Sequence, residues 1–320
     1  MSLQIDSEVL AELAPLLAAA ADREPPPVGD VATRRASSRQ MFGQLLSARR
    51  AADGVAVQKF TLDTDDGAVL TLSWYRPEGA DRSGGAALYL HGGGMIFGLH
   101  ELGDLYDWSA RRYVADSGVP MLLVDYRTAP EFPHPVPVQD CFAALVWLAE
   151  HAGELGFDPA RVAVMGDSAG GGLAAAVCLM ARDRGGPAVA LQVLIYPMLD
   201  DRTTLPDPEL VPFVTWTYDD NLTGWQALLG HSIGGHGVSE YAAPARAADL
   251  SLLPPTYIDV GELDIFRDED ITYAARLAAA GISTELHVHP GCPHAFEGLA
   301  PNAAVSQRAI ADRVRRLLAL

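Results

Sequence analysis

The sequence predicts an α/β protein in which helices cover both faces of a mainly parallel sheet. Short and almost wholly apolar runs recur from residue 86 onward, and amphipathic helical patterns separate them. Strands that are buried on both faces have such continuous apolar runs, whereas strands with one face in water alternate. A hydrophobic content of 49% in 320 residues is enough for a large core.

The chain before residue 86 is expected to contain two helices and a hairpin. Pro25-Pro26-Pro27 ends the first helical pattern, which is rich in Ala and Leu. Asp65-Asp66-Gly67 is a turn sequence between two strand patterns, and it therefore predicts a hairpin. The helices are expected over 6–21 and 30–50, and the strands over Val55–Thr64 and Val69–Pro77.

After the hairpin, strands and helices alternate, which is the pattern of a parallel sheet with crossover helices. The strands are expected at Ala86–Leu90, Val119–Asp125, Val162–Met165, Val189–Tyr196, Thr256–Val260 and Thr284–His289. The helices are expected near 101–117, 137–151, 169–183, 266–281 and 303–319.

The interval between Tyr196 and Pro254 breaks this alternation, because it is long and has too little strand pattern to extend the sheet. We expect a cap insertion at about 200–245, to which the N-terminal helices in 1–50 contribute, on a catalytic domain that spans 51–320. Four aromatic residues of the insertion either line an acyl or alcohol pocket or form the cap's own core: Phe213, Trp216, Tyr218 and Trp225.

A serine lies on a sharp turn between a strand and a helix, in the pentapeptide Gly166-Asp167-Ser168-Ala169-Gly170. Such a turn raises the serine hydroxyl above the sheet edge, where it can act as a nucleophile. Gly166 and Gly170 are needed because a side chain at either position would collide with a neighbouring strand or helix. About 0.13 occurrences are expected by chance in this composition, so a glycine-rich turn that binds phosphate is the alternative.

The run His91-Gly92-Gly93-Gly94 ends an earlier strand, and it is far more specific, with about 0.007 chance occurrences. Consecutive glycines leave backbone N–H groups uncovered. We expect those of Gly92 and Gly93, with that of Ala169, to form an oxyanion hole. His91, Gly94, Glu131 and Asp167 are assigned supporting roles that order this loop or the serine turn, and Arg127 is expected to pair with Glu131 or Asp167.

A general base is expected after the serine, because the chain order on such a fold is serine, acid, histidine. His294 follows the last strand in a loop from which its side chain reaches over the strand ends. The other histidines are placed less well, since His231 and His236 lie in the insertion and His287 and His289 share one face of a strand.

Asp264 is the expected acid, because it lies at the transition from a strand to the following loop. Glu262 is its nearest rival. Asp268-Glu269-Asp270 instead has the composition of an acidic first turn of the next helix.

From about Leu88 to Leu299 the chain resembles the hormone-sensitive lipase group of α/β-hydrolases, the bacterial family IV esterases. The shared motifs are the glycine run, Asp125–Glu131, Gly166–Gly171 and the segments around Asp264 and His294, with departures at Thr128, Ile265 and Ala295. The resemblance implies an α/β-hydrolase fold with an eight-stranded sheet, a helical cap and no cofactor. It also implies hydrolysis of short acyl esters, with Ser168 as nucleophile, Asp264 as acid and His294 as base.

The expected function is therefore that of a serine carboxylesterase or lipase-like hydrolase, which acts on short-to-medium acyl esters through an acyl-enzyme. A lactonase or an amidase with the same catalytic triad stays open. A non-catalytic ligand receptor is disfavoured, because the plant gibberellin receptors that resemble this family have lost the histidine that is present here as His294.

The net charge, the cysteine content and the hydropathy limit which partners, metal sites and location are expected. The formal charge of −18 disfavours nucleic acids and anionic membrane surfaces and suits a small uncharged ester. Cys141, Cys178 and Cys292 are odd in number and include no Cys-x-x-Cys pair, so no disulfide framework or metal site is expected. No secretory signal or membrane span is recognised, which predicts a cytoplasmic protein without stable membrane insertion. Whether it forms a homodimer is left open.

Overall fold

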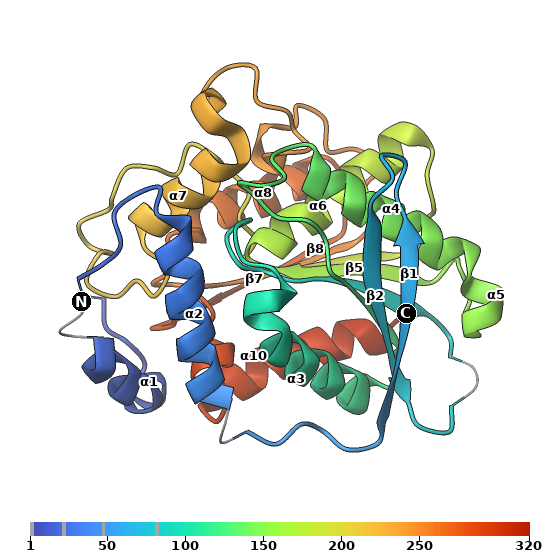
Figure 1. The fold of residues 1–320 in the computed structure, drawn as a ribbon, viewed down its shortest axis with the longest axis horizontal. Coiled ribbons are helices and arrows are strands. Elements are labelled where there is room, and N and C mark those ends of the chain that lie inside the picture. Colours follow the sequence, from blue (N-terminus) through green and yellow to red (C-terminus); the bar gives the residue numbers. More distant parts are fainter. Residues whose placement is uncertain (1–2, 21–23, 47–48, 81–82) are drawn as a thin grey trace.

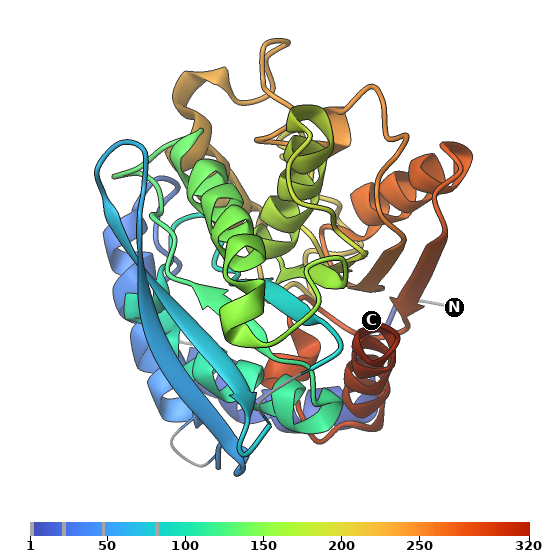
Figure 2. The same cartoon turned by 90° about the vertical axis from the view of Figure 1, so that its right-hand side faces the viewer.

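The computed structural model describes residues 3–20, 24–46, 49–80 and 83–320. These residues contain an eight-stranded sheet between two layers of helices (Figures 1 and 2). The strands are β1 (Val55–Asp63), β2 (Val69–Pro77), β3 (Ala86–Leu90), β4 (Met121–Val124), β5 (Val162–Asp167), β6 (Leu191–Ile195), β7 (Thr256–Gly261) and β8 (Thr284–His289).

The strand order is β1-β2-β4-β3-β5-β6-β7-β8, and the predicted fold class is confirmed. β1 pairs antiparallel with β2, and β2 with β4, whereas all later pairs are parallel. Figure 2 shows the β1–β2 hairpin as a long twisted ribbon along one side of the molecule. The antiparallel edge comes from the tight turn that joins β1 to β2, since only antiparallel neighbours can be joined so closely.

Helices α3 and α10 cover one face of the sheet, and α4, α6 and α8 cover the other (Figure 1). The helices are α1 (Ser7–Ala20), α2 (Val31–Leu46), α3 (Leu99–Ser117), α4 (Val136–Glu150), α5 (Ala152–Leu155), α6 (Ala169–Arg184), α7 (Tyr218–Leu229), α8 (Arg267–Ala279), α9 (Phe296–Leu299) and α10 (Ala304–Leu318). Each predicted strand and helix is present with slightly different ends. Residue 21, the predicted end of the first helix, lies outside the described residues, as do residues 47–48 of the second predicted helix. The second helix ends at Leu46 and does not extend to residue 50.

The inner strands are buried on both faces, which explains their continuous apolar sequences. Leu88 and Val164 pack in the core beneath α4 and α6, whereas their neighbours Tyr89 and Met165 pack in the core beneath α3 and α10. Successive side chains of a strand point to opposite faces. Both faces therefore need apolar residues, and the core has two layers.

The parallel strands end at the edge of the sheet where the insertion and α2 lie. The insertion between β6 and β7 contains α7, which was not predicted as a separate helix. Its start has a sequence signal, because Thr217 and Asp220 form a reciprocal capping box. Arg34 of α2 bonds Asp220 at 2.7 Å, so the N-terminal segment and the insertion are joined. Among the described helices, none is long and apolar enough to cross a bilayer.

Candidate active site

Ser168 lies in the turn from β5 to α6 with φ 55° and ψ −121°. This left-handed φ is strained for a residue with a side chain, and strained backbone of this kind is concentrated at functional sites. A Cβ added to Gly166 would lie 2.2 Å from the Gly170 carbonyl oxygen, and one added to Gly170 would lie 2.1 Å from that of Leu90. The two glycines thus permit the close approach that raises the serine above the sheet.

Ser168, His294 and Asp264 form one continuous line of hydrogen bonds. The Ser168 Oγ lies 3.0 Å from His294 Nε2, and His294 Nδ1 lies 2.6 Å from Asp264 Oδ2. A carboxylate can only accept, so Nδ1 carries the ring proton and Nε2 is the acceptor for the serine hydroxyl. All three side chains are at least nine-tenths buried, which shields this line from water.

The His294 ring is held from several elements. The Thr215 hydroxyl in the insertion donates to the His294 carbonyl at 2.6 Å, and the Tyr196 and Phe266 rings contact the imidazole edge to face at 4.6 and 5.2 Å between ring centroids. Asp264 is fixed in turn, because its Oδ1 accepts the Phe266 N–H at 3.0 Å. The geometry of the line therefore depends on the loops after β6, β7 and β8 together.

The prediction that Gly92 contributes an oxyanion-hole N–H is wrong. This N–H donates to the Tyr106 hydroxyl at 2.6 Å, and that hydroxyl donates to Asp167 Oδ2 at 2.6 Å. Within the described chain, the N–H groups of Gly93, Gly94 and Ala169 have no hydrogen-bond acceptor. These three groups are therefore free to bind an oxygen above the serine.

The glycine loop is packed against the insertion. A Cβ on Gly94 would lie 2.3 Å from the Trp216 ring, and one on Gly224 of α7 would lie 2.4 Å from the Gly94 carbonyl oxygen. Only glycine allows both approaches. The insertion thus covers the loop directly, which holds its backbone N–H groups in place.

His91 supports the same loop from below. Its ring stacks on the Tyr126 ring with centroids 4.0 Å apart, and its Nδ1–H donates to the Gly92 carbonyl at 2.8 Å. Complete burial lowers the pKa of His91 to about 4. The ring is therefore neutral near pH 7 and acts as a fixed hydrogen-bond donor.

Asp167 and Glu131 have different surroundings. Asp167 accepts bonds from Tyr106 and Tyr89, and burial raises the pKa of its carboxyl to about 6 although these bonds lower it. Glu131 instead pairs with Arg35 of α2 at 2.7 Å and is half-exposed. Because Arg35 also donates to the carbonyls of Ile96 and Ala129, Glu131 acts on the glycine loop only through α2.

The expected partner of Arg127 is wrong. Arg127 pairs with Asp140 and Asp66, both at 2.7 Å, and with neither Glu131 nor Asp167. The bond to Asp66 ties the turn of the β1–β2 hairpin to the start of the loop that leads to α4. Sequence alone does not place the hairpin turn beside this loop.

A cavity of about 290 Å³ opens beside Ser168 and His294. Trp216 lines it, but the other three aromatic candidates do not: Trp225 and Tyr218 belong to the main core, and Phe213 lies in a turn outside the lining. Sequence periodicity in the insertion did not separate these roles. Much of the apolar wall comes instead from α2 and α3, through Met41, Phe42, Leu102, Leu105 and Trp108.

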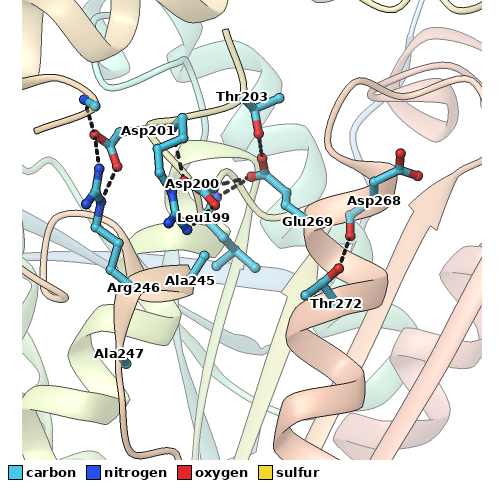
Figure 3. A network of polar contacts seen from close by, with 12 residues as sticks. Leu199, Asp200, Asp201, Thr203, Ala245, Arg246, Ala247, Asp268, Glu269 and Thr272 are labelled. Atoms are coloured by element: carbon cyan, nitrogen blue, oxygen red, sulfur yellow. Dashed lines mark hydrogen bonds and ion pairs between the residues drawn. The ribbon is translucent and has the colours of Figure 1, made fainter. Parts of the chain in front are cut away.

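A buried polar network joins the base of the insertion to the helix that follows Asp264 (Figure 3). The Glu269 carboxylate at the start of α8 accepts the N–H groups of Leu199 and Asp200 at 2.7 and 3.1 Å and also bonds the Thr203 hydroxyl. Nearby, Asp201 is fully buried and pairs with Arg246. Glu269 is therefore more than a residue of an acidic first turn.

The remaining rivals and the cysteines lie outside this arrangement. Glu262 accepts the Gly291 N–H at 2.9 Å rather than a bond from His294. Cys292 is fully buried, and burial raises the pKa of its thiol to about 12, so it is not accessible to thiol reagents. Cys141 and Cys178 are buried, as expected. His287 and His289 lie side by side with ring centroids 6.1 Å apart.

Comparison with known proteins finds an alpha/beta hydrolase family and relatives that are named esterases or ester hydrolases. A protein family described by the alpha/beta hydrolase fold matches residues 87–298. Esterase LipI of Mycobacterium tuberculosis is 37% identical over 251 residues, which cover 76% of each chain. An ethyl acetate hydrolase of Pseudomonas putida is 32% identical over 262 residues, or 78% of this chain and 79% of that protein. A solved bacterial heroin esterase has a TM-score of 0.86 and 37% identity, over 98% of this chain and 97% of its own.

Proposed function

Because the chain belongs to the alpha/beta hydrolase family and is a carboxylic ester hydrolase, we propose that Ser168, His294 and Asp264 are its catalytic triad. The observation that carries the proposal is the buried line of hydrogen bonds, with distances of 3.0 and 2.6 Å. The nucleophile, the base and the group that orients the base are within direct contact, which is the geometry that serine acyl transfer requires.

In this mechanism His294 Nε2 takes the Ser168 proton as Oγ attacks the ester carbonyl. Asp264 holds the ring in the tautomer that accepts this proton and stabilises the imidazolium that results. The imidazolium then protonates the departing alcohol, which leaves an acyl-enzyme. Water, activated by the same histidine, attacks the acyl group and releases the acid and the free serine.

We assign the oxyanion hole to the N–H groups of Gly93, Gly94 and Ala169. Gly94 takes the place of Gly92 in the predicted set, because the Gly92 N–H is already bonded to Tyr106. The N-terminus of α6 also favours negative charge at this point. Each such donor typically lowers the barrier by roughly 3 kcal/mol.

We further propose that residues 1–50 and about 200–245 act together as the cap of a catalytic domain that spans 51–320. Two observations support this division. Residues of α2 and Trp216 of the insertion line the same cavity, and the Arg34–Asp220 ion pair joins the two segments across 186 residues. Opening of either segment would change access to Ser168.

The proposed substrates are short-to-medium acyl esters without a negative charge. A cavity of about 290 Å³ is small for a long acyl chain. The related ethyl acetate hydrolase has a name that denotes a short-chain substrate, which favours the same range here.

The test is hydrolysis of p-nitrophenyl esters from acetate to laurate. We expect the highest kcat/KM among the shorter chains, and a fall in kcat of on the order of 10⁴ to 10⁶ in Ser168→Ala. Asp264→Asn should lose activity strongly, whereas its matched control Glu262→Gln should not. Wild-type turnover in folded Ser168→Ala would overturn the triad, and best activity on the longest chains would overturn the substrate range.

A further inference from the structure

One wall of the cavity beside Ser168 is polar, in contrast to the apolar wall from α2 and α3. This wall consists of four tyrosines and two acids that belong to β3, the serine turn, α3, the loop after β6 and α9. They are Tyr89, Tyr106, Tyr113, Tyr196, Asp167 and Glu297. The proposed reaction uses none of the tyrosine hydroxyls or the Glu297 carboxylate directly.

Glu297 has one carboxylate oxygen without a partner. Its Oε1 accepts bonds from the Tyr196 hydroxyl at 2.7 Å and from Arg313 Nη1 at 2.5 Å. Its Oε2 is buried and receives no hydrogen bond from any described residue, and the whole residue is only 8% exposed. A buried carboxylate oxygen without a donor is unfavourable. Because Glu297 lines the cavity, a turn of its carboxylate would let a group that enters the cavity act as the donor.

The charges behind this wall leave an excess of negative charge. Arg313 is fully buried and pairs with Asp259 through two bonds at 2.7 and 2.9 Å, as well as with Glu297. One cation therefore faces two carboxylates. Asp167 adds a further acidic group on the same wall, and burial makes its ionisation less favourable.

The two arginines that line the cavity do not offset this excess. Arg34 is bonded to Asp220 at 2.7 Å, and Arg112 lies 3.6 Å from Asp116. Each is thus already paired with an acid. The cavity consequently favours a hydrogen-bond donor or a cation over an acceptor or an anion.

We propose that Glu297 binds a hydrogen-bond donor of the substrate, so that the preferred esters carry a hydroxyl or ammonium group on the part that enters the cavity. This inference rests on the proposed ester hydrolysis at Ser168 and adds a specificity-determining residue to it. A donor group satisfies Glu297 Oε2, whereas a methyl group in the same place leaves it unpaired. Sites built to bond a polar substrate group reject the analogue that lacks it.

Two matched sets of esters test the proposal in the wild-type enzyme. One set has p-nitrophenyl esters whose acyl chains of four to eight carbons end in a methyl, a hydroxymethyl or an aminomethyl group. The other has butyrate esters of alkanols that carry the same three ends. We expect donor-bearing esters of one set to exceed their methyl-ended partners in kcat/KM by about 10-fold or more at the best chain length. Equal or lower values in both sets at every length overturn the proposal.

Glu297→Gln provides a second test, because its amide retains an oxygen for Tyr196 and Arg313 and replaces the free Oε2 with an N–H donor. We expect the ratio of kcat/KM for donor-bearing over methyl-ended esters to fall at least about 10-fold in this variant. The ratio should stay constant in Glu262→Gln, whose carboxylate lies outside the cavity. An unchanged ratio in Glu297→Gln overturns the role of Glu297.

The failure of this inference and the failure of the proposed function have different signatures. Hydrolysis of p-nitrophenyl acetate in the wild type, and its loss in Ser168→Ala, report on the triad alone. If both are observed but no ester set shows the preference, the triad stands and the donor site is wrong. If the wild type hydrolyses none of the esters, the proposed function itself fails.

Discussion

The Tyr106 hydroxyl joins two groups that must both be in place beside the nucleophile. It accepts the Gly92 N–H and donates to Asp167, each at 2.6 Å. Tyr106 itself comes from α3 and lies 61 residues before Asp167 in the sequence. A single buried hydroxyl therefore sets the conformation of the glycine loop relative to Ser168.

Tyr106→Phe should lower both stability and kcat. It leaves the Gly92 N–H without its acceptor, which costs about 1 to 3 kcal/mol, and it frees the loop that carries the proposed oxyanion hole. Tyr89→Phe is the matched control, because Tyr89 bonds Asp167 but not Gly92. Urea unfolding and kcat on p-nitrophenyl butyrate measure the two effects. Equal losses of kcat in both variants would show that the bond to Gly92 does not matter.

Asp167 makes stability depend on pH in a predictable direction. Burial raises the pKa of its carboxyl from 3.8 to about 6, so the folded state binds the proton more tightly than the unfolded state. Such a group contributes stability below pH 4, and that contribution is lost as the pH rises through 6. Asp167→Asn cannot ionise and should lack this loss.

The stability of Asp167→Asn relative to the wild type should therefore rise between pH 4 and pH 7. The difference in pKa corresponds to about 3 kcal/mol. Urea unfolding of both proteins at these two pH values measures it, and all other titrating groups cancel in the comparison. A constant difference between the two proteins would contradict the assigned shift.

At the scale of elements, hydrogen bonds of Glu269 connect the start of α8 to the base of the insertion. Glu269 lies five residues after Asp264 and bonds the backbone just after β6 (Figure 3). Burial raises the pKa of Glu269 well above its usual range, which favours the neutral acid. The position of the proposed catalytic acid is thereby coupled to the base of the insertion.

Glu269→Ala should unfold more easily than the wild type by about 2 to 4 kcal/mol, since two backbone N–H groups and a hydroxyl lose their acceptor. It should also lower kcat, because the start of α8 is freed next to Asp264. Glu269→Gln should lose far less, since the amide oxygen can accept the same N–H groups and the side chain resembles the neutral acid. Equal loss in both variants would show that an oxygen acceptor for these N–H groups is not what stabilises the start of α8.

At the scale of the whole molecule, the charge of −18 acts on substrates from a distance. The Debye length falls from about 30 Å at 0.01 M salt to about 8 Å at 0.15 M, so repulsion of an anionic substrate weakens with salt. We expect kcat/KM for a p-nitrophenyl ester with a terminal carboxylate to rise several-fold over this range, and that for p-nitrophenyl butyrate to stay flat. A flat response of the anionic ester would show that the charge has no role in substrate choice.

The sequence by itself determined the fold class and most element positions, because apolar runs and helical periods are local properties of the chain. It also determined the turn at Ser168, since the strand, the two glycines and the helix are contiguous. For His294 and Asp264, the chain order and their positions after strands were sufficient to predict that both lie beside the serine.

Only the tertiary structure decided what surrounds these three residues. Tyr106 takes the Gly92 N–H, α2 supplies part of the cavity wall, and Trp216 but not Trp225 faces the cavity. Glu297 and Arg313 become partners with an oxygen left over. The physical reason is that hydrogen bonding and burial at these positions depend on elements that are distant in sequence. No local pattern tells which N–H is already bonded or which ring is already covered.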